Sequence, residues 1–109
     1  MERVSEKIYS VNEIKEMLFN YLVNTKVRKV ILFGSYSKNM ATKVSDIDLV
    51  IDTNGLLRGF AFLDLVLDLE KLFNKKVNGF ECYEIIENST IDNEIKQTGI
   101  VVYENVIQM

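Results

Sequence analysis

Two small residues and two carboxylates are spaced as a chain would need them to hold a phosphate group beside a metal ion. Gly34 and Ser35 follow an apolar run over residues 29–33. Asp46, eleven residues after Ser35, opens a second apolar run together with Asp48. Glycine lets a backbone turn approach a phosphate closely, and serine can donate to it through its hydroxyl and its N–H. Carboxylates one residue apart on a strand share a face, where they repel unless a cation or a donor lies between them.

Each half of this pattern is weak when taken alone. A Gly-Ser pair is a common turn, and an Asp-x-Asp triplet often does no more than open a strand. The two halves together, each at the end of an apolar run, favour a nucleotide–metal site. Hard oxygen ligands suit magnesium, which keeps some of its waters and also binds substrate phosphate.

Composition excludes several other classes of protein. The chain has 109 residues, enough for the single domain that we expect over residues 1–109. It contains no histidine, which excludes Ser-His-Asp and Cys-His hydrolases. Cys82 is the only cysteine, so no internal disulfide can form, and we expect a cytoplasmic protein. The net charge of −3 argues against binding long nucleic acid, and no apolar run is long enough to span a membrane.

Apolar periodicity predicts alternating helices and strands. The expected order is a helix at 10–24, a strand at 27–33, a short turn or helix at 35–39, a strand at 45–52, a helix at 58–74, a strand region at 77–86, a helix from Ser89 to Gly99 and a strand at 100–103. Ser10 and Glu13 have the spacing of a capping box at the first helix. The fold class is therefore α/β, with helices packed on one mixed sheet of about four strands.

The helix at 58–74 is more apolar than one buried face requires. Its broad apolar face, predicted to meet the sheet, consists of Phe62, Leu65, Val66, Leu69, Leu72 and Phe73. A polar stripe is predicted at Asp64, Asp68, Lys71 and Lys75. Between the two lie Phe60, Leu63 and Leu67. These three residues either widen the core contact or form a docking stripe for a second protein chain.

The segment from Phe33 to Leu49 resembles the signature of minimal nucleotidyltransferase (MNT) domains of the DNA polymerase beta superfamily. That signature is Gly-Ser, ten residues, then Asp-x-Asp, and here the spacer runs over residues 36–45. The resemblance implies the nucleotidyltransferase fold and transfer of AMP from ATP with Mg²⁺. It implies that Gly34, Ser35 and Lys38 bind the nucleotide and that Asp46 and Asp48 bind the metal. It also implies a protein partner, because MNT proteins are often paired with a HEPN-type ribonuclease toxin that they neutralise by adenylylation or by binding.

The sequence departs from the family pattern at the third acid. The family usually has an aspartate on the next strand, where this chain has Asn78. An amide carbonyl carries no charge and cannot accept a proton, and loss of a positioned base typically costs about 10²–10⁴ in rate. Glu81 could substitute only if a bulge at Gly79 turned it toward Asn78. Asn39 stands where the family often has glycine, which suggests a left-handed backbone there.

Three functions follow from these residues. The first is an MNT-type nucleotidyltransferase that uses ATP and Mg²⁺ to modify a protein partner, as the antitoxin of a HEPN/MNT pair, with Asn78 at the third-acid position. The second is a nucleotide- or partner-binding module with little or no chemistry, which Asn78 favours and which could also self-associate through the helix at 58–74. The third, transfer to a small molecule such as an aminoglycoside, is disfavoured because no added domain holds the acceptor.

Overall fold

The structure, a computed structural model, describes residues 5–105. Along the chain these residues form α1 (Val11–Leu22), β1 (Lys29–Phe33), β2 (Ile47–Asp52), α2 (Phe60–Phe73), β3 (Val77–Glu81), the short 3-10 helix η1 (Cys82–Glu84), α3 (Thr90–Thr98) and β4 (Ile100–Glu104). The predicted α/β class is confirmed. Within the described residues, no helix combines the length and the apolarity needed to cross a membrane.

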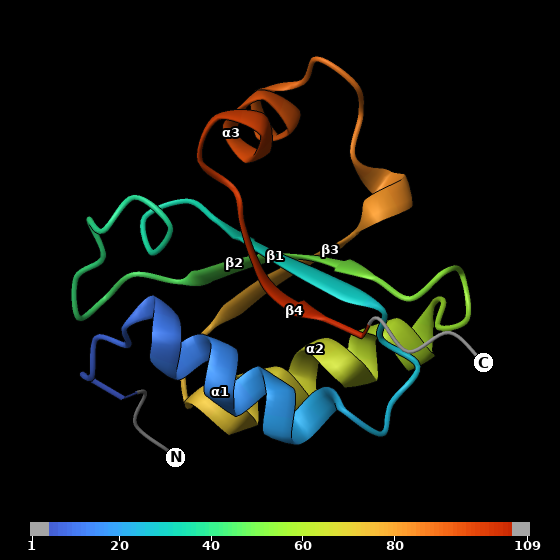
Figure 1. Cartoon of the computed structure of the whole chain (residues 1–109), viewed down its shortest axis with the longest axis horizontal. Helices are drawn as coiled ribbons and strands as arrows, with labels where there is room; N and C mark the ends of the chain where they lie inside the picture. Colours follow the sequence, from blue (N-terminus) through green and yellow to red (C-terminus); the bar gives the residue numbers. More distant parts are fainter. Residues whose placement is uncertain (1–4, 106–109) are drawn as a thin grey trace.

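The four strands of the described chain form one mixed sheet in the order β3-β2-β1-β4 (Figure 1). Strand β1 pairs antiparallel with β2 and with β4, whereas β2 pairs parallel with β3. A parallel pair needs a crossover connection, and α2 supplies it. As a result, the end of β1 and the beginnings of β2 and β3 lie at the same edge of the sheet.

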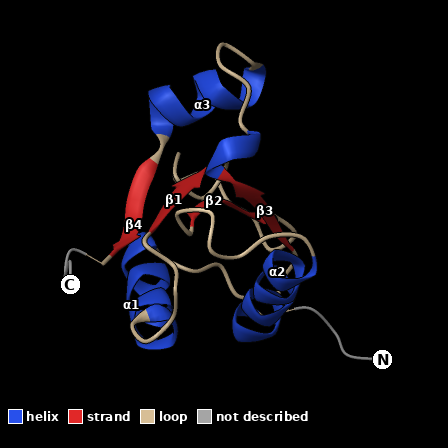
Figure 2. Cartoon of the chain, turned by 90° about the vertical axis from the view of Figure 1, so that its right-hand side faces the viewer, coloured by secondary structure: helices blue, strands red, loops and turns tan. Residues whose placement is uncertain are grey.

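The helices divide unequally between the two faces of the sheet. Helices α1 and α2 cover one face, and α3 lies over the other (Figures 1 and 2). Alternation along β2 buries Ile47, Leu49 and Ile51 against the α1–α2 layer, at 0–1% exposure, and turns Asp48 and Val50 toward the α3 side. The same strand therefore builds the main core with one face and presents a carboxylate on the other.

The capping box predicted at the start of α1 is present. The Ser10 hydroxyl accepts the Glu13 backbone N–H at 3.0 Å, and the Glu13 carboxylate accepts the Ser10 backbone N–H at 2.9 Å. Both groups satisfy donors that the first turn of a helix leaves without partners. Helix α1 then buries a stripe that consists of Ile14, Leu18 and Leu22.

Helix α2 has one apolar surface that is buried against the sheet and a second that is exposed. Of the face predicted to meet the sheet, Phe62, Leu65, Leu69 and Phe73 are buried, and Val66 and Leu72 pack against the core. The residues predicted to lie between the apolar face and the polar stripe are exposed, with Phe60 at 85%, Leu63 at 48% and Leu67 at 45%. The interpretation of these three as a wider core contact is therefore wrong. Lys75 also differs from prediction, because it is buried at 4% exposure instead of lying in a solvated stripe.

Of the turn or short helix predicted at 35–39, the structure has hydrogen-bonded turns, which cover residues 34–39. The strand region predicted at 77–86 is too long, because β3 ends at Glu81 and the 3-10 helix η1 follows it. The Ser37 hydroxyl donates to the Gly34 carbonyl at 2.9 Å, a side-chain bond that competes with helix formation. Asn39 has the left-handed backbone expected of it, with φ of 58°. Ser89 caps α3 as predicted, since its hydroxyl accepts the Asp92 N–H.

We expect Ser10→Ala to lower the free energy of unfolding by about 1 kcal/mol, because the Glu13 N–H loses its acceptor. Urea unfolding followed by circular dichroism measures the change. Lys15→Ala, at an exposed position of the same helix, is the matched control and should change that free energy by less than about 0.5 kcal/mol. Equal losses in the two variants would contradict a stabilising role for the capping box.

Candidate active site

The register of the sheet brings the residues singled out by the sequence into one row. Phe33 of β1 pairs with Asp48 of β2, and Asp48 pairs with Asn78 of β3. The Asn78 Nδ2 atom donates to Asp48 Oδ1 at 2.8 Å and to Asp46 Oδ2 at 3.3 Å. The two carboxylates therefore lie on one face, as alternation predicts, and the amide lies between them.

Gly34 closes the row at the end of β1. It has φ of +76°, in the left-handed region that favours glycine, and a Cβ atom added there would overlap Asp48 Oδ2. The absence of a side chain at this position is what lets the turn after β1 approach the carboxylate. Any residue other than glycine would have to displace the Asp48 side chain.

The turn after Gly34 is closed by its own hydrogen bonds. The Met40 N–H donates to the Ser35 carbonyl at 2.9 Å, and the Lys38 N–H donates to the Gly34 carbonyl at 3.3 Å. Ser35 is half-buried next to the row. Because no helix begins here, a helix dipole cannot contribute to phosphate binding. The groups that this turn offers to a phosphate are its hydroxyl and amide groups and the Lys38 ammonium group.

Sequence reasoning missed one acidic residue near the site. Glu94 belongs to α3, and its Oε1 atom lies 3.4 Å from the Nζ atom of Lys38. Both side chains are partly exposed, at 33% for Glu94 and 40% for Lys38. The two residues are 56 positions apart, so only the packing of α3 over this face brings them together. Lys38 is thus partnered by a carboxylate on the side of the sheet that carries the site.

Burial and like charges set the electrostatics of Asp48. Burial raises the pKa of the Asp48 carboxyl, and the hydrogen bond from Asn78 lowers it. The charges of Asp46 and Glu94 raise this pKa further, Lys38 lowers it, and the net result is a pKa above the usual range. A cation bound beside Asp48 would relieve both the burial cost and the repulsion.

The donor set fits a divalent metal ion, though incompletely. Asp46 and Asp48 offer hard carboxylate oxygens on one face, which is what Mg²⁺ prefers. Asn78 could add its Oδ1 atom if the amide turned by half a rotation, since its oxygen and nitrogen are nearly isosteric. Within residues 5–105, no third Asp, Glu, His or Cys side chain completes a metal-binding group.

Glu81 does not replace the missing acid. The pairing of β2 with β3 runs without interruption from Ile47↔Val77 to Ile51↔Glu81, so Gly79 introduces no bulge. Alternation therefore leaves Glu81 on the opposite face from Asn78. The Glu81 side chain instead accepts the Glu84 backbone N–H in a capping box at η1.

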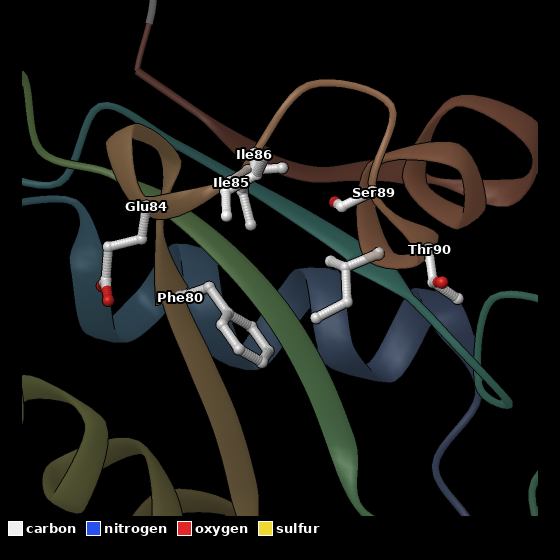
Figure 3. A pocket seen from close by; sticks show the side chains of 7 residues that line it. Phe80, Glu84, Ile85, Ile86, Ser89 and Thr90 are labelled. Atoms are coloured by element: carbon white, nitrogen blue, oxygen red, sulfur yellow. The ribbon is translucent and has the colours of Figure 1, made fainter.

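A mostly apolar pocket of about 460 Å³ lies between β3, η1 and α3 (Figure 3). Its lining residues are Phe80, Glu84, Ile85, Ile86, Ser89, Thr90 and Ile91. Phe80 follows Asn78 by two residues on the same face, and its ring lies 6.0 Å from that of Phe33, centroid to centroid. The pocket therefore opens on the same face of the sheet as Asn78. Sequence reasoning missed it because its walls come from three separate elements.

Comparison with known proteins identifies the family. The model of the family described as "Polymerase beta, Nucleotidyltransferase" matches residues 12–108. The chain therefore belongs to this nucleotidyltransferase family, as the Gly-Ser and Asp-x-Asp pattern predicted.

Curated relatives from Methanocaldococcus jannaschii carry a more specific name. One "Putative protein adenylyltransferase" of this organism is 33% identical over 95 residues, which cover 84% of this chain and 91% of that protein. A second protein of the same name and organism is 33% identical over 72 residues, which cover 63% of this chain and 74% of that protein.

Solved structures show the same fold. A chain of a complex described as a toxin-antitoxin with AMP-PNP has a TM-score of 0.65 at 22% identity, covering 90% of this chain and 76% of that chain. A chain of the complex of a tri-AMPylated Shewanella oneidensis HEPN toxin with an MNT antitoxin has a TM-score of 0.56 at 22% identity, covering 87% and 70%. These likenesses confirm the predicted nucleotidyltransferase fold.

We expect Asp48→Asn to raise the free energy of unfolding at neutral pH in a buffer that contains a chelator. The native pKa of Asp48 is raised, so the unfolded state releases its proton first as the pH increases. The natural chain then loses stability until the pH exceeds the native pKa, whereas the neutral variant does not. The two chains should therefore have equal free energies of unfolding at acid pH. These free energies should diverge as the pH rises above the usual pKa of an aspartate. Urea unfolding at a series of pH values measures this.

Asp52→Asn is the control, because it should change the free energy of unfolding in the opposite direction. Burial raises the pKa of Asp52, but the hydrogen bond from Arg28 at 2.7 Å and other donors lower it more, and the net shift is downward. Asp52 therefore stabilises the fold above the usual aspartate pKa and loses that contribution as the pH falls. Its variant should be less stable than the natural chain at neutral pH. A loss of stability in Asp48→Asn as well would refute our account of Asp48.

Proposed function

We propose that residues 1–109 act as one minimal nucleotidyltransferase domain that transfers AMP from ATP to a hydroxyl group of a protein partner in the cytoplasm. The observation that carries this proposal is the row formed by Gly34, Asp48 and Asn78 across three strands. It places Gly34, at the start of the turn after β1, against the carboxylate pair at one edge of the sheet. The name shared by the relatives, protein adenylyltransferase, supports AMP as the group transferred.

Each site residue has a role in this proposal. Gly34 and Ser35 hold the triphosphate, Lys38 contributes a positive charge to it, and Asp46 and Asp48 hold Mg²⁺. The bound metal would neutralise charge on the reacting phosphate. The acceptor oxygen forms a bond to the α-phosphorus, the bond from that phosphorus to the pyrophosphate oxygen breaks, and the hydroxyl proton passes to solvent water. Asn78 cannot accept this proton, because an amide is not a base.

A second function, binding without turnover, is favoured by the hydrogen bonds of Asn78. Its amide donates to both carboxylates and so stabilises the pair in the absence of a cation. An aspartate at this position would add a third negative charge and make a cation necessary. The chain could then neutralise a partner by binding it, with slow chemistry or none.

We expect the natural chain to transfer label from [α-³²P]ATP to its genomic-neighbour protein slowly, and Asn78→Asp to do so about 10²–10⁴ times faster, because a proton acceptor is restored. Asp48→Asn should abolish transfer in both backgrounds. The measurement is label on the separated partner protein over time with Mg²⁺. Label transfer by the natural chain would rule out the inactive alternative, and transfer by the variant alone would rule out turnover in the natural chain.

The exposed stripe on α2, formed by Phe60, Leu63 and Leu67, supports a protein partner. These large apolar side chains lie on the outer side of the helix, away from the sheet that Leu65 and Leu69 contact. Contiguous exposed apolar groups of this kind mark interaction sites. We propose a HEPN-type toxin as the occupant, because toxin-antitoxin complexes are among the proteins of similar fold. A second copy of this chain is the alternative occupant.

We expect Leu63→Asp and Leu67→Asp to weaken the complex with that partner by at least 10-fold, because each buries an unpaired charge in an apolar contact. ATP binding should stay unchanged, since α2 covers the face opposite the site. Ile8→Asp is the matched control, because Ile8 is also 48% exposed but precedes α1. Isothermal titration calorimetry measures both affinities. Unchanged affinity for the partner would rule the stripe out. A mass in solution above that of a single chain, lowered by these substitutions, would indicate self-association instead.

A further inference from the structure

Lys75 is a buried lysine that lies just after α2. It is 4% exposed, and the preceding residue, Asn74, has the left-handed backbone that ends the helix. Lysine is almost never buried unless its ammonium group has partners. The position therefore calls for a specific set of acceptors.

The acceptors are backbone carbonyls from two segments far apart in sequence. The Lys75 Nζ atom donates to the Ser5 carbonyl at 2.8 Å and to the Lys43 carbonyl at 3.1 Å. Ser5 belongs to the segment before α1, and Lys43 belongs to the loop between β1 and β2. One side chain thus holds both segments against the beginning of β3.

The Lys43 contact falls in the turn that leads to Asp46. This turn is closed by the Ser45 N–H, which donates to the Thr42 carbonyl at 3.1 Å, and by the Thr42 N–H, which donates to the Ser45 hydroxyl at 2.8 Å. On the other side of Asp46, the Ile47 N–H donates to the Lys76 carbonyl at 3.0 Å. The backbone of Asp46 is therefore fixed from both sides by residues 75 and 76.

We propose that Lys75 is a positioning residue that sets Asp46 against Asn78 and Asp48. Lys75 precedes Asn78 by three residues, and the amide of Asn78 contacts Asp46 at 3.3 Å. Lys75 thus connects the loop before β3 with the loop before β2, and it is not one of the residues proposed to hold the nucleotide or the metal. The consequence for metal binding rests on the proposed function, whereas the positioning of Asp46 does not.

Backbone hydrogen exchange tests the positioning directly. Lys75→Met keeps an unbranched side chain of nearly the same length but removes its donors, and Lys76→Met at the exposed neighbouring position is the matched control. We expect the amides of Ser45 and Ile47 to exchange about 10-fold faster in Lys75→Met, with the amide of Val50 unchanged, because the opening is local. Lys76→Met should leave all three rates unchanged. Unchanged rates at Ser45 and Ile47 in Lys75→Met, or equal acceleration at Val50, would overturn the proposal.

Metal affinity tests the consequence for the site. The dissociation constant of Mn²⁺ in the presence of AMP-PNP, read by electron paramagnetic resonance, should rise about 10-fold in Lys75→Met, as is usual when support for a metal ligand is lost. An unchanged constant beside faster exchange would overturn the link to the site. A natural chain that binds no Mn²⁺ would contradict the proposed function, while the exchange rates would still decide the positioning. If Lys75→Met does not fold, Lys75→Gln, which keeps a shorter donor, takes its place with the same readouts.

Discussion

The antiparallel pairing of β1 with β2 is the constraint on which the rest of the site depends. It sets Phe33 opposite Asp48, so that Gly34 lies directly against the carboxylate. A slip of one residue would turn Asp48 into the core and expose Leu49, because side chains alternate along a strand. The burial of Ile47, Leu49 and Ile51 therefore does more than stabilise the domain. It fixes the register, and the register places the carboxylates.

Asn78 gives this site a balance of charge that an aspartate would not. The parallel pairing of β3 with β2 brings the third strand to the carboxylates in any case, so the identity of one side chain decides the outcome. With an amide there, the repulsion between Asp46 and Asp48 is moderated by hydrogen bonds from within the protein. The fold keeps the architecture of its family, while the row carries one negative charge fewer than with an aspartate and has no proton acceptor at position 78.

The parts of the fold and site that could be predicted are those encoded by neighbours in the sequence. The Ser10–Glu13 capping box, the shared face of Asp46 and Asp48, and the left-handed Asn39 each follow from a few adjacent residues. The sequence predicted either a turn or a short helix over 35–39, because hydrogen bonds within so short a segment decide between the two. The contacts of Lys38 with Glu94 and of Lys75 with Lys43 depend on how α3 and a loop pack, and no local pattern reports that packing.

Helix α3 differs from the rest of the domain in how it is held. None of its residues is buried, and its local order comes from the Ser89 cap and from the ion pair between Lys96 and Asp92 at 2.9 Å. The free energy of a local opening depends chiefly on buried apolar contacts, so α3 should detach far more readily than α1 or α2 unfold. This weakly anchored helix carries Glu94 and one wall of the pocket. A local opening of α3 would therefore separate Glu94 from Lys38 and remove one wall of the pocket, while the core under α1 and α2 keeps its packing.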